Sequence, residues 1–246
     1  MSGLRAPPGR LQIMAAGADT FDRLALFNRT VVGTRRGDLP LRLATSVAMI
    51  NAVLRPGVDV AEINRTLDDL AAKCPSNSFD ALRTYMFDDL GFRADASGVS
   101  DPRNSMLGDV LRTRRGLPVL IATTVMAVGL RLRVPVTGIG MPFQVLIGDP
   151  RRRGRYVDPV AGELWDAAAA QECFMTLAAG RLEWDERFLR PVRTEAIIER
   201  ILRNLEMTFR QQGAAADLAL VVSMMAQLPH MAARAVEARR LCHVFN

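Results

Sequence analysis

One long uncharged stretch of the chain, from Gly116 to Leu130, is apolar on nearly every side when it is drawn as a helix. Leu117, Ile121 and Val128 fall on one stripe, and further apolar residues fill the other faces. A surface helix shows a single apolar stripe, so a helix that is apolar all round is normally buried. The stretch is also too short for the ~20 residues that span a bilayer. We therefore expect the chain to fold around this helix, with other elements covering it.

Helices are predicted on the N-terminal side of this stretch, because apolar residues recur there at helical spacing. The predicted helices are one that begins at Asp19 or Thr20, one from Leu39 to Leu54, one after Asp59, and one from Phe79 to Leu90. Gly91 is a favourable residue for ending the last of them. With 49% hydrophobic residues, the 246-residue chain can bury a substantial core.

After the apolar helix the pattern changes to short runs of β character. They cover 134–140, 143–148 and 156–157, and the polar segment 149–155 is typical of a hairpin loop. Helical patterns return after Trp165. The last of these helices cover about 191–212, 214–228 and 230–244, separated by Pro191, Gly213 and Pro229.

This order of elements predicts an α+β fold in which the buried central helix packs against a small antiparallel sheet. Helices precede this core, and further helices follow it. The corresponding division is a flexible tail over 1–18, a domain over 19–190 and a C-terminal helical extension over 191–246.

Cysteine and charge content restrict the class of protein. Cys74, Cys173 and Cys242 are far apart and show neither disulfide nor metal-ligand spacing. We therefore expect a reducing, cytoplasmic compartment, with neither a metal nor a cofactor. The net charge of +6 comes from arginines scattered along the chain, which argues against a concentrated nucleic-acid surface. Neither a signal peptide nor a membrane span is expected.

Three segments carry a resemblance when they are taken together with their order and spacing. They are Asp101–Ser105, Arg114–Pro118 and Tyr156–Pro159, and Leu132–Pro135 precedes a strand between the last two. Over about residues 40–210 the set resembles the bacterial transglutaminase-like family, whose members often carry C-terminal tetratricopeptide repeats.

The resemblance implies a papain-like site. In such a site the nucleophile lies at the N-terminus of the buried helix, where backbone N–H groups and the helix dipole favour a thiolate and an oxyanion. A histidine on the adjacent strand acts as the base, and a carboxylate on the next strand orients it.

Two of these three positions are changed in this chain. Leu120 and Ala122 stand where the repeat-bearing family commonly has serines, and the start of the helix contains no cysteine. Gln144 stands where the resemblance implies a histidine. A glutamine side chain donates and accepts hydrogen bonds, but it cannot act as a base near neutral pH. Asp158 retains the residue type that the resemblance implies.

Two polar segments near this site allow more than one interpretation. Asp158 is either an acid of the cleft or the cap of an Asp-Pro turn. Asp101, Arg103 and Asn104 either line a polar pocket or satisfy the backbone of their own loop. The predicted cleft residues are Gln144, Pro118, Leu120, Ala122, Asp101, Arg103 and Asn104, with Asp158 as the candidate catalytic group.

Other polar groups favour simpler interpretations. The densest basic cluster is formed by Arg151, Arg152, Arg153 and Arg155. No aromatic residue is interleaved with these arginines for base stacking, which favours a solvated loop over a nucleic-acid contact. The two histidines of the chain, His230 and His243, lie in the C-terminal helices without a partner at metal-ligand spacing.

Three functional hypotheses follow. The favoured one is a cytoplasmic, non-hydrolytic family member that binds an unknown small molecule or protein partner in the former catalytic cleft. The second is a repurposed enzyme that uses Asp158 for non-covalent acid–base chemistry on a small biosynthetic intermediate. The third is an interaction scaffold that works through the helices of 191–246. A homo-oligomer is compatible with all three.

Overall fold

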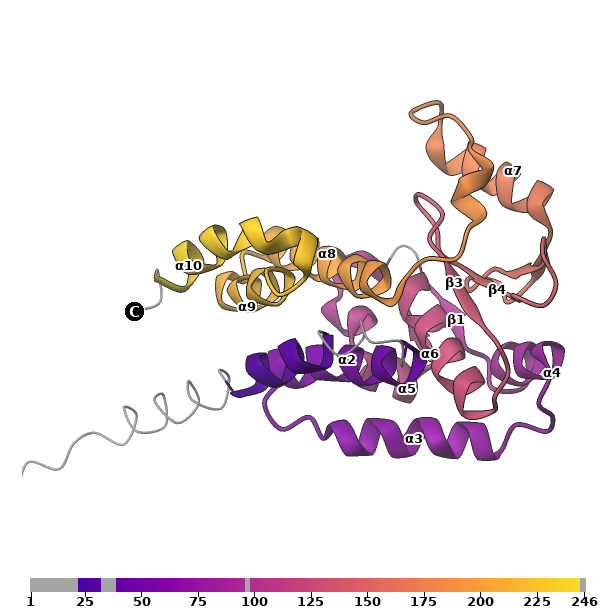
Figure 1. Ribbon diagram of the computed structural model, residues 1–246, viewed down its shortest axis with the longest axis horizontal. Coiled ribbons are helices and arrows are strands. Elements are labelled where there is room, and N and C mark those ends of the chain that lie inside the picture. The colour runs from indigo at the N-terminus through magenta and orange to yellow at the C-terminus, as the bar shows by residue number, and fades with distance from the viewer. Residues whose placement is uncertain (1–21, 32–38, 96–97, 244–246) are drawn as a thin grey trace, which may run out of the picture.

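A computed structural model describes residues 22–31, 39–95 and 98–243 of the chain (Figure 1). The predicted tail over 1–18 and the predicted cap at Asp19 or Thr20 lie outside these residues. Within them the fold is α+β, as the sequence predicts, because helices dominate and one small antiparallel sheet lies beside them.

The N-terminal half is helical. It consists of a helical segment over 22–31 and of α2 (Leu39–Leu54), α3 (Val60–Ala72), α4 (Phe79–Arg83) and α5 (Leu107–Thr113). α4 continues into a π-helical turn, and two 3-10 turns and a short parallel strand pair surround α5. Their bounds are Thr84–Asp89 for the π-helix, Gly98–Ser100 and Pro102–Ser105 for the 3-10 turns, and Arg93–Ala94 (β1) and Arg115–Gly116 (β2) for the strands.

Local sequence explains where these helices start. The Asp59 carboxylate accepts a hydrogen bond from the backbone N–H of Ala61 at 2.7 Å and caps α3. Ser78 caps α4 in the same way. Side-chain oxygens at these positions satisfy backbone donors that have no partner within the helix.

The apolar stretch forms α6 (Pro118–Arg131), which is buried along most of its length. It contacts α2, α3, α5, α8 and the first two strands of the sheet, so neighbouring elements cover it as its composition predicts. Its two buried threonine hydroxyls both have a hydrogen-bond acceptor. Thr123 and Thr124 donate to the carbonyls four residues earlier, at 2.7 and 2.8 Å.

The sheet has the order β3-β4-β5-β6, and every neighbouring pair is antiparallel. Its strands are β3 (Thr137–Ile139), β4 (Leu146–Gly148), β5 (Tyr156–Val157) and β6 (Leu164–Trp165). Successive side chains of a strand point to opposite faces. Ile147 and Val157 therefore join the core around α6, whereas Leu146 and Tyr156 join a second, smaller core around α7 (Ala167–Ala178).

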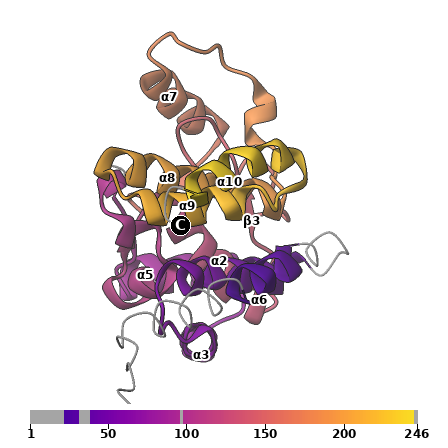
Figure 2. The same cartoon turned by 90° about the vertical axis from the view of Figure 1, so that its left-hand side faces the viewer.

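The C-terminal helices form a layer over the N-terminal ones (Figure 2). They are α8 (Thr194–Gln212), α9 (Ala215–Met225), a 3-10 segment (Pro229–Arg234) and α10 (Ala235–His243). Ile198, Ile201 and Leu205 of α8 are fully buried in the same core as α6. The predicted domain boundary at residue 191 stays a prediction, and α8 shares a core with the residues before it.

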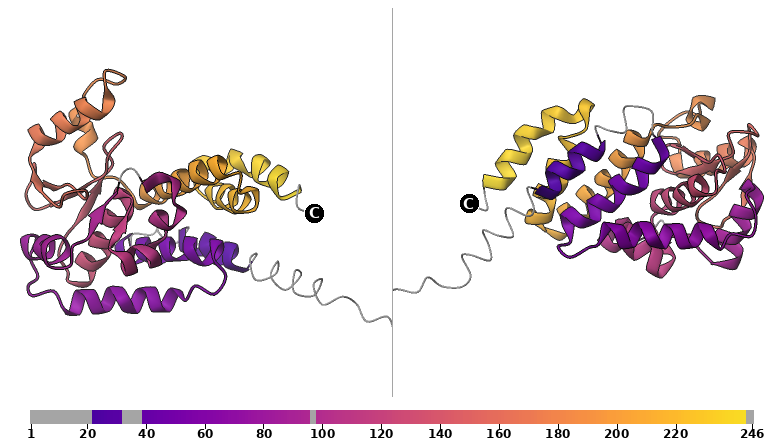
Figure 3. Two further views of the ribbon diagram at one scale, coloured as in Figure 1. Left: turned by 180° about the vertical axis from the view of Figure 1, so that it is seen from behind. Right: turned by 60° about the horizontal axis from the view of Figure 1, so that its bottom comes forward.

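The segment around α7 projects from the helical body in Figure 1 and in the left view of Figure 3. A 3-10 turn, Glu186–Leu189, ends it. Phe174 anchors its interior, with ring centroids 5.3 Å from those of both Trp184 and Phe188. No helix of the described residues combines the length and the apolar character that a bilayer span requires.

Candidate functional site

Gln144 and Asp158 meet in the structure, although 14 positions separate them in the chain. Gln144 precedes β4, and Asp158 directly follows β5, its neighbour in the sheet. The Nε2 of Gln144 donates to Oδ1 of Asp158 at 3.3 Å, and both side chains are buried. At the position where the sequence resemblance implies a histidine, Gln144 therefore gives the carboxylate a hydrogen-bond donor without a titratable proton.

Asp158 also caps the turn that follows it. Its two carboxylate oxygens accept the backbone N–H groups of Val160 at 3.2 Å and Ala161 at 2.9 Å. The turn closes where Gly162, at a φ of 75°, donates its N–H to the Asp158 carbonyl at 2.7 Å. Asp158 is therefore a turn cap and a neighbour of Gln144 at the same time.

Burial raises the pKa of Asp158 above its ordinary value. The hydrogen bonds from Ala161 and Val160 act in the opposite direction, and the charge of Glu163 adds to the increase. A buried carboxylate loses hydration that favours its charged form, and backbone donors restore part of it.

The turn before Gln144 has an unusual backbone. Phe143 adopts a φ of 67°, in the left-handed region that ordinarily favours glycine. Its ring lies 6.2 Å from that of Phe174, and the guanidinium of Arg181 lies 5.2 Å above it. Both partners belong to the α7 segment. That segment therefore holds the strained turn that orients Gln144.

The start of α6 carries no reactive side chain. Leu120 is fully buried and Ala122 is 2% exposed, and both pack in the core around α6. Pro118 occupies the first turn, where a missing N–H costs no hydrogen bond. Leu117 precedes it without a side-chain cap.

A pocket of about 110 Å³ lies between the start of α6, the segment before β4, and α8. Its walls are Leu117, Pro118, Val119, Phe143, Gln144, Val145, Arg200 and Asn204. Pro118 and Gln144 were predicted as cleft residues, and they line this pocket together. Leu120 and Ala122 do not belong to its lining, because their side chains point into the core.

The sequence pattern does not predict Arg200 and Asn204 as residues of the cleft. They lie one turn apart on α8, on the helix face that meets the pocket. Their only sequence signal is a polar pair at i and i+4 on an otherwise amphipathic helix, which many solvated helix faces also show.

The loop residues predicted for the cleft satisfy their own segment. Asp101 caps the 3-10 turn that follows it and pairs with Arg103 at 2.7 Å. The Asn104 side chain donates to the Gly98 carbonyl at 3.0 Å, and its backbone carbonyl accepts the N–H of Leu117 at 2.8 Å. The loop thus holds the start of α6 through the hydrogen bond from Leu117 to Asn104, and the loop side chains do not line the pocket.

A profile of the transglutaminase-like superfamily matches residues 59–203, which is more than half of the chain. The match begins just before α3 and ends within α8, so it includes the start of α6, Gln144, Asp158 and Arg200. This chain belongs to the transglutaminase-like superfamily.

Several curated relatives carry the name UPF0162 protein. The one from Xylella fastidiosa strain 9a5c is 32% identical over 134 residues, which cover 52% of this chain and 48% of the relative. The one from Pseudomonas aeruginosa is 27% identical over 154 residues, covering 63% of this chain and 56% of the relative. The chain thus spans about half the length of the curated relatives it matches. No solved structure matches it.

A papain-like site requires a thiol or an imidazole close to its carboxylate, so the positions of the cysteines and histidines relative to Asp158 matter. Cys173 of α7 is half-buried, and its pKa is raised, first by burial and then by the charge of Asp158. A raised pKa keeps the thiol protonated and therefore weakly nucleophilic. Cys74 instead lies next to α3 and contacts the Ser76 carbonyl.

The described imidazole lies elsewhere. His230, in the 3-10 segment before α10, pairs with Glu199 of α8 at 2.6 Å. The side chains of Cys242 and His243 lie outside the described part of the chain. Within that part, no three residues among His, Cys, Asp and Glu gather to hold a metal ion.

The arginines of the hairpin loop point outward or pair locally. Arg151, Arg152 and Arg153 are exposed. Arg155 turns back to the carboxylate of Asp80 and lies over the ring of Phe79, with its guanidinium carbon 5.6 Å from the ring centroid. This arrangement is that of a solvated loop anchored at one end.

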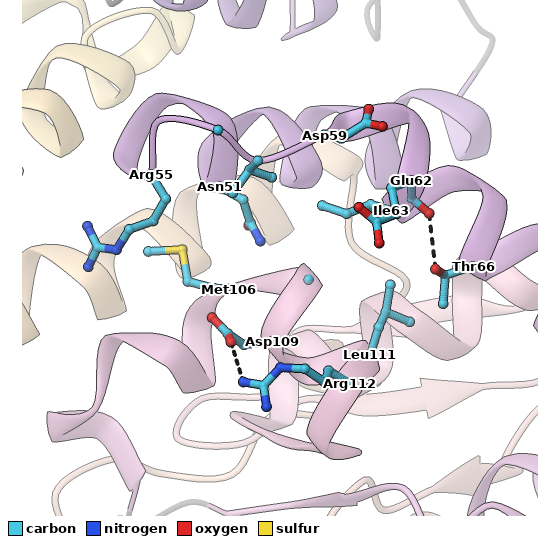
Figure 4. Close-up of a pocket in the computed structure, with 13 residues that line it drawn as sticks. Asn51, Arg55, Asp59, Glu62, Ile63, Thr66, Met106, Asp109, Leu111 and Arg112 are labelled. Atoms are coloured by element: carbon cyan, nitrogen blue, oxygen red, sulfur yellow. Dashed lines mark hydrogen bonds and ion pairs between the residues drawn. The ribbon is translucent and has the colours of Figure 1, made fainter. Parts of the chain in front are cut away.

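A larger pocket of about 380 Å³ opens between the α2–α3 connection and α5 (Figure 4). Its lining carries charges of both signs, and Asp109 pairs with Arg112 at 2.7 Å inside it. Arg55, on its rim, pairs with Asp217 of α9 at 3.2 Å. None of the positions implied by the papain-like site lines this pocket.

Proposed function

We propose that this chain is a non-hydrolytic member of the transglutaminase-like superfamily that binds a ligand in its former catalytic cleft. The observation that carries the proposal is the hydrogen bond between Gln144 and Asp158, made where the parent chemistry needs a base. An amide cannot accept the proton of a nucleophile near neutral pH. Leu120 and Ala122, for their part, supply no nucleophile at the start of α6.

The pocket beside this pair gives the proposal a location. Polar groups from two separate elements, Gln144 before β4 and Arg200 and Asn204 of α8, line a concavity whose other walls are apolar side chains. Concave apolar sites with a few convergent polar groups are the usual form of small-ligand sites. Binding without chemistry needs only this arrangement.

Two measurements test the proposal. Purified protein is assayed for amide hydrolysis and for transfer of a fluorescent amine to a glutamine-containing peptide, and no turnover above buffer is expected. Thermal melts are then recorded with millimolar panels of small carboxylates, amides and amines. At least one class is expected to raise the Tm of the wild type, but not that of Asn204→Trp, whose indole fills the pocket.

Two outcomes would overturn it. The first is amide turnover that disappears in Asp158→Asn. The second is a melt series in which no class stabilises the wild type, or in which the pocket-filled variant gains as much.

A repurposed enzyme is the second candidate, and one observation favours it. The raised pKa of Asp158 is a feature of catalytic carboxylates. Against this candidate, both Asp158 oxygens already accept backbone hydrogen bonds, and the residue does not line the pocket. A cluster of biosynthetic genes around the coding gene would favour the enzyme.

The scaffold hypothesis has less support. Among the large apolar side chains of the described residues after 190, Met207 and Val236 are exposed, and the others are buried or partly buried. Two exposed apolar side chains provide little surface for a docking patch. The cytoplasmic location stays a prediction.

A further inference from the structure

Arg200 stands out among the arginines of α8, because no carboxylate of the described residues pairs with it. Arg203 pairs with Glu199 at 2.6 Å and Arg210 pairs with Glu206 at 2.8 Å, each across one helical turn. Arg200 instead donates one Nη1 hydrogen bond to the Met141 carbonyl at 3.0 Å. A guanidinium has five N–H donors, so most of its capacity is unused.

The charge of Arg200 is also partly withdrawn from water. Burial lowers the pKa of its guanidinium, which still remains protonated at any physiological pH. A cation that has lost hydration without gaining a counter-ion is costly for a protein to keep. An anion bound beside it would recover part of that cost.

The rest of the pocket fits an anion. Arg200 carries the only charge in its lining, so the lining as a whole is positive. Asn204 lies one turn further along α8, and its carboxamide makes no hydrogen bond to any described residue. The backbone N–H of Val119, at the start of α6, is likewise without an acceptor in the described part of the chain.

The size of the pocket limits what can enter. Its volume of about 110 Å³ is below the roughly 300–1,000 Å³ of sites that enclose a whole drug-sized ligand. One functional group fits, and the rest of the ligand would extend past the exposed ring of Phe143, which is 48% exposed at the pocket rim. The single positive charge matches a carboxylate better than a phosphate, which carries up to two negative charges.

We propose that this pocket binds the carboxylate end of a small ligand, with Arg200 as its anchor and Asn204 and Gln144 as flanking amides. The inference rests on the proposed function, which requires that the cleft binds a ligand, and it adds the chemical class of that ligand. A planar guanidinium binds a planar carboxylate through two parallel hydrogen bonds, which gives both strength and orientation.

The test uses acetate and propionate as probes on the full chain. The Nε–Hε signals of the arginines are followed by NMR during titration, with acetamide as the uncharged match and inorganic phosphate as a second anion. We expect the Arg200 signal to shift and saturate with acetate and propionate, and to stay in place with acetamide.

Three variants assign the effect. Arg200→Gln lacks the reporter signal, so its binding is followed by the rise in Tm with propionate. It should bind propionate about 10-fold or more weakly, because a hydrogen bond to a charged group is lost. Arg200→Lys keeps the charge and should retain part of the affinity. Arg203→Gln, on the same helix but outside the pocket, should bind within about 2-fold of the wild type, a difference smaller than one hydrogen bond makes.

Several outcomes overturn the inference. Acetamide could bind as well as acetate, Arg200→Gln could bind carboxylates unchanged, or phosphate could bind and carboxylates not. If amides or amines stabilise the wild type while carboxylates do nothing, the cleft still binds ligands and only the assignment to carboxylates fails. The comparison of acetate with acetamide is made on wild-type protein, so the folding of the variants does not affect that result.

Discussion

The start of α6 and the Gln144–Asp158 pair, the two halves of the site that the family resemblance implies, differ in chemical character. At the start of α6, Leu120 and Ala122 are apolar and belong to the core. At the strand ends, Gln144 and Asp158 remain polar, buried and hydrogen-bonded. One half is apolar and part of the core, and the other half is a buried polar framework.

The difference follows from what each position does besides chemistry. A nucleophile at the start of a buried helix supports no other structure, so an apolar side chain there gains burial free energy. Asp158 caps a turn with both of its oxygens, so its loss would strand backbone donors. We infer that Asp158 has a structural role that does not depend on catalysis.

The largest expected effect comes from placing a serine in the apolar half. Leu120→Ser leaves a cavity at a fully buried position, and we expect it to lower the free energy of unfolding by about 4 kcal/mol. Ala122→Ser adds one hydroxyl, which can bond to a carbonyl of its own helix, and should cost about 1 kcal/mol. Urea unfolding measures both. If both variants lowered the free energy of unfolding by the same small amount, the start of α6 would not be part of the core.

Removing the carboxylate tests the polar half. Asp158→Ala leaves the N–H groups of Val160 and Ala161 and the Gln144 amide without their acceptor, and should cost about 3 kcal/mol. Asp166→Ala, which removes an exposed cap of α7, is the matched control and should cost about 1 kcal/mol. If the two variants lose the same stability, Asp158 is an ordinary surface cap and the comparison above is wrong.

The turn that holds Gln144 can be tested through its backbone. Phe143→Ala and Phe143→Gly both lose the ring contacts, but only glycine adopts a positive φ without strain. We therefore expect Phe143→Gly to be more stable than Phe143→Ala by about 1 kcal/mol, measured by thermal unfolding. The same pair at Arg133, which has a φ of 57°, should differ in the same direction. Equal stabilities at residue 143 would exclude strain at this turn.

The smallest expected effect is on how the stability contributed by Asp158 depends on pH. Because burial raises the pKa of Asp158, the folded state disfavours its charged form. The stability of the wild type relative to Asp158→Asn is therefore highest below pH 3.8 and decreases as the pH rises through the folded-state pKa.

Asp101 should behave in the opposite way. Its side-chain hydrogen bond with Arg103 lowers its pKa, so its contribution is present above pH 3.8 and decreases as the pH falls. Urea melts of the two Asn variants across the acidic range would separate them. Parallel profiles would contradict the assignment of burial as the dominant cause at Asp158.

Much of the fold could be predicted from local pattern. The all-round apolar character of α6 predicts its burial, and the short apolar runs around Ile147 and Tyr156 predict strands, whose two faces are both covered in the structure. Caps such as Asp59 fix helix starts within a few residues. The absence of a nucleophile and a base, predicted from residue identity at the start of α6 and at Gln144, stays a prediction.

The sequence by itself therefore determined the α+β order and the central helix, because these depend on neighbours along the chain. Only the tertiary structure decided which polar groups share a pocket. Arg200 contacts Met141 across 59 positions of sequence, and Gln144 meets Asp158 because their strands pair in the sheet. Such contacts depend on how α8 packs over α6, and residue spacing along the chain carries no record of that packing.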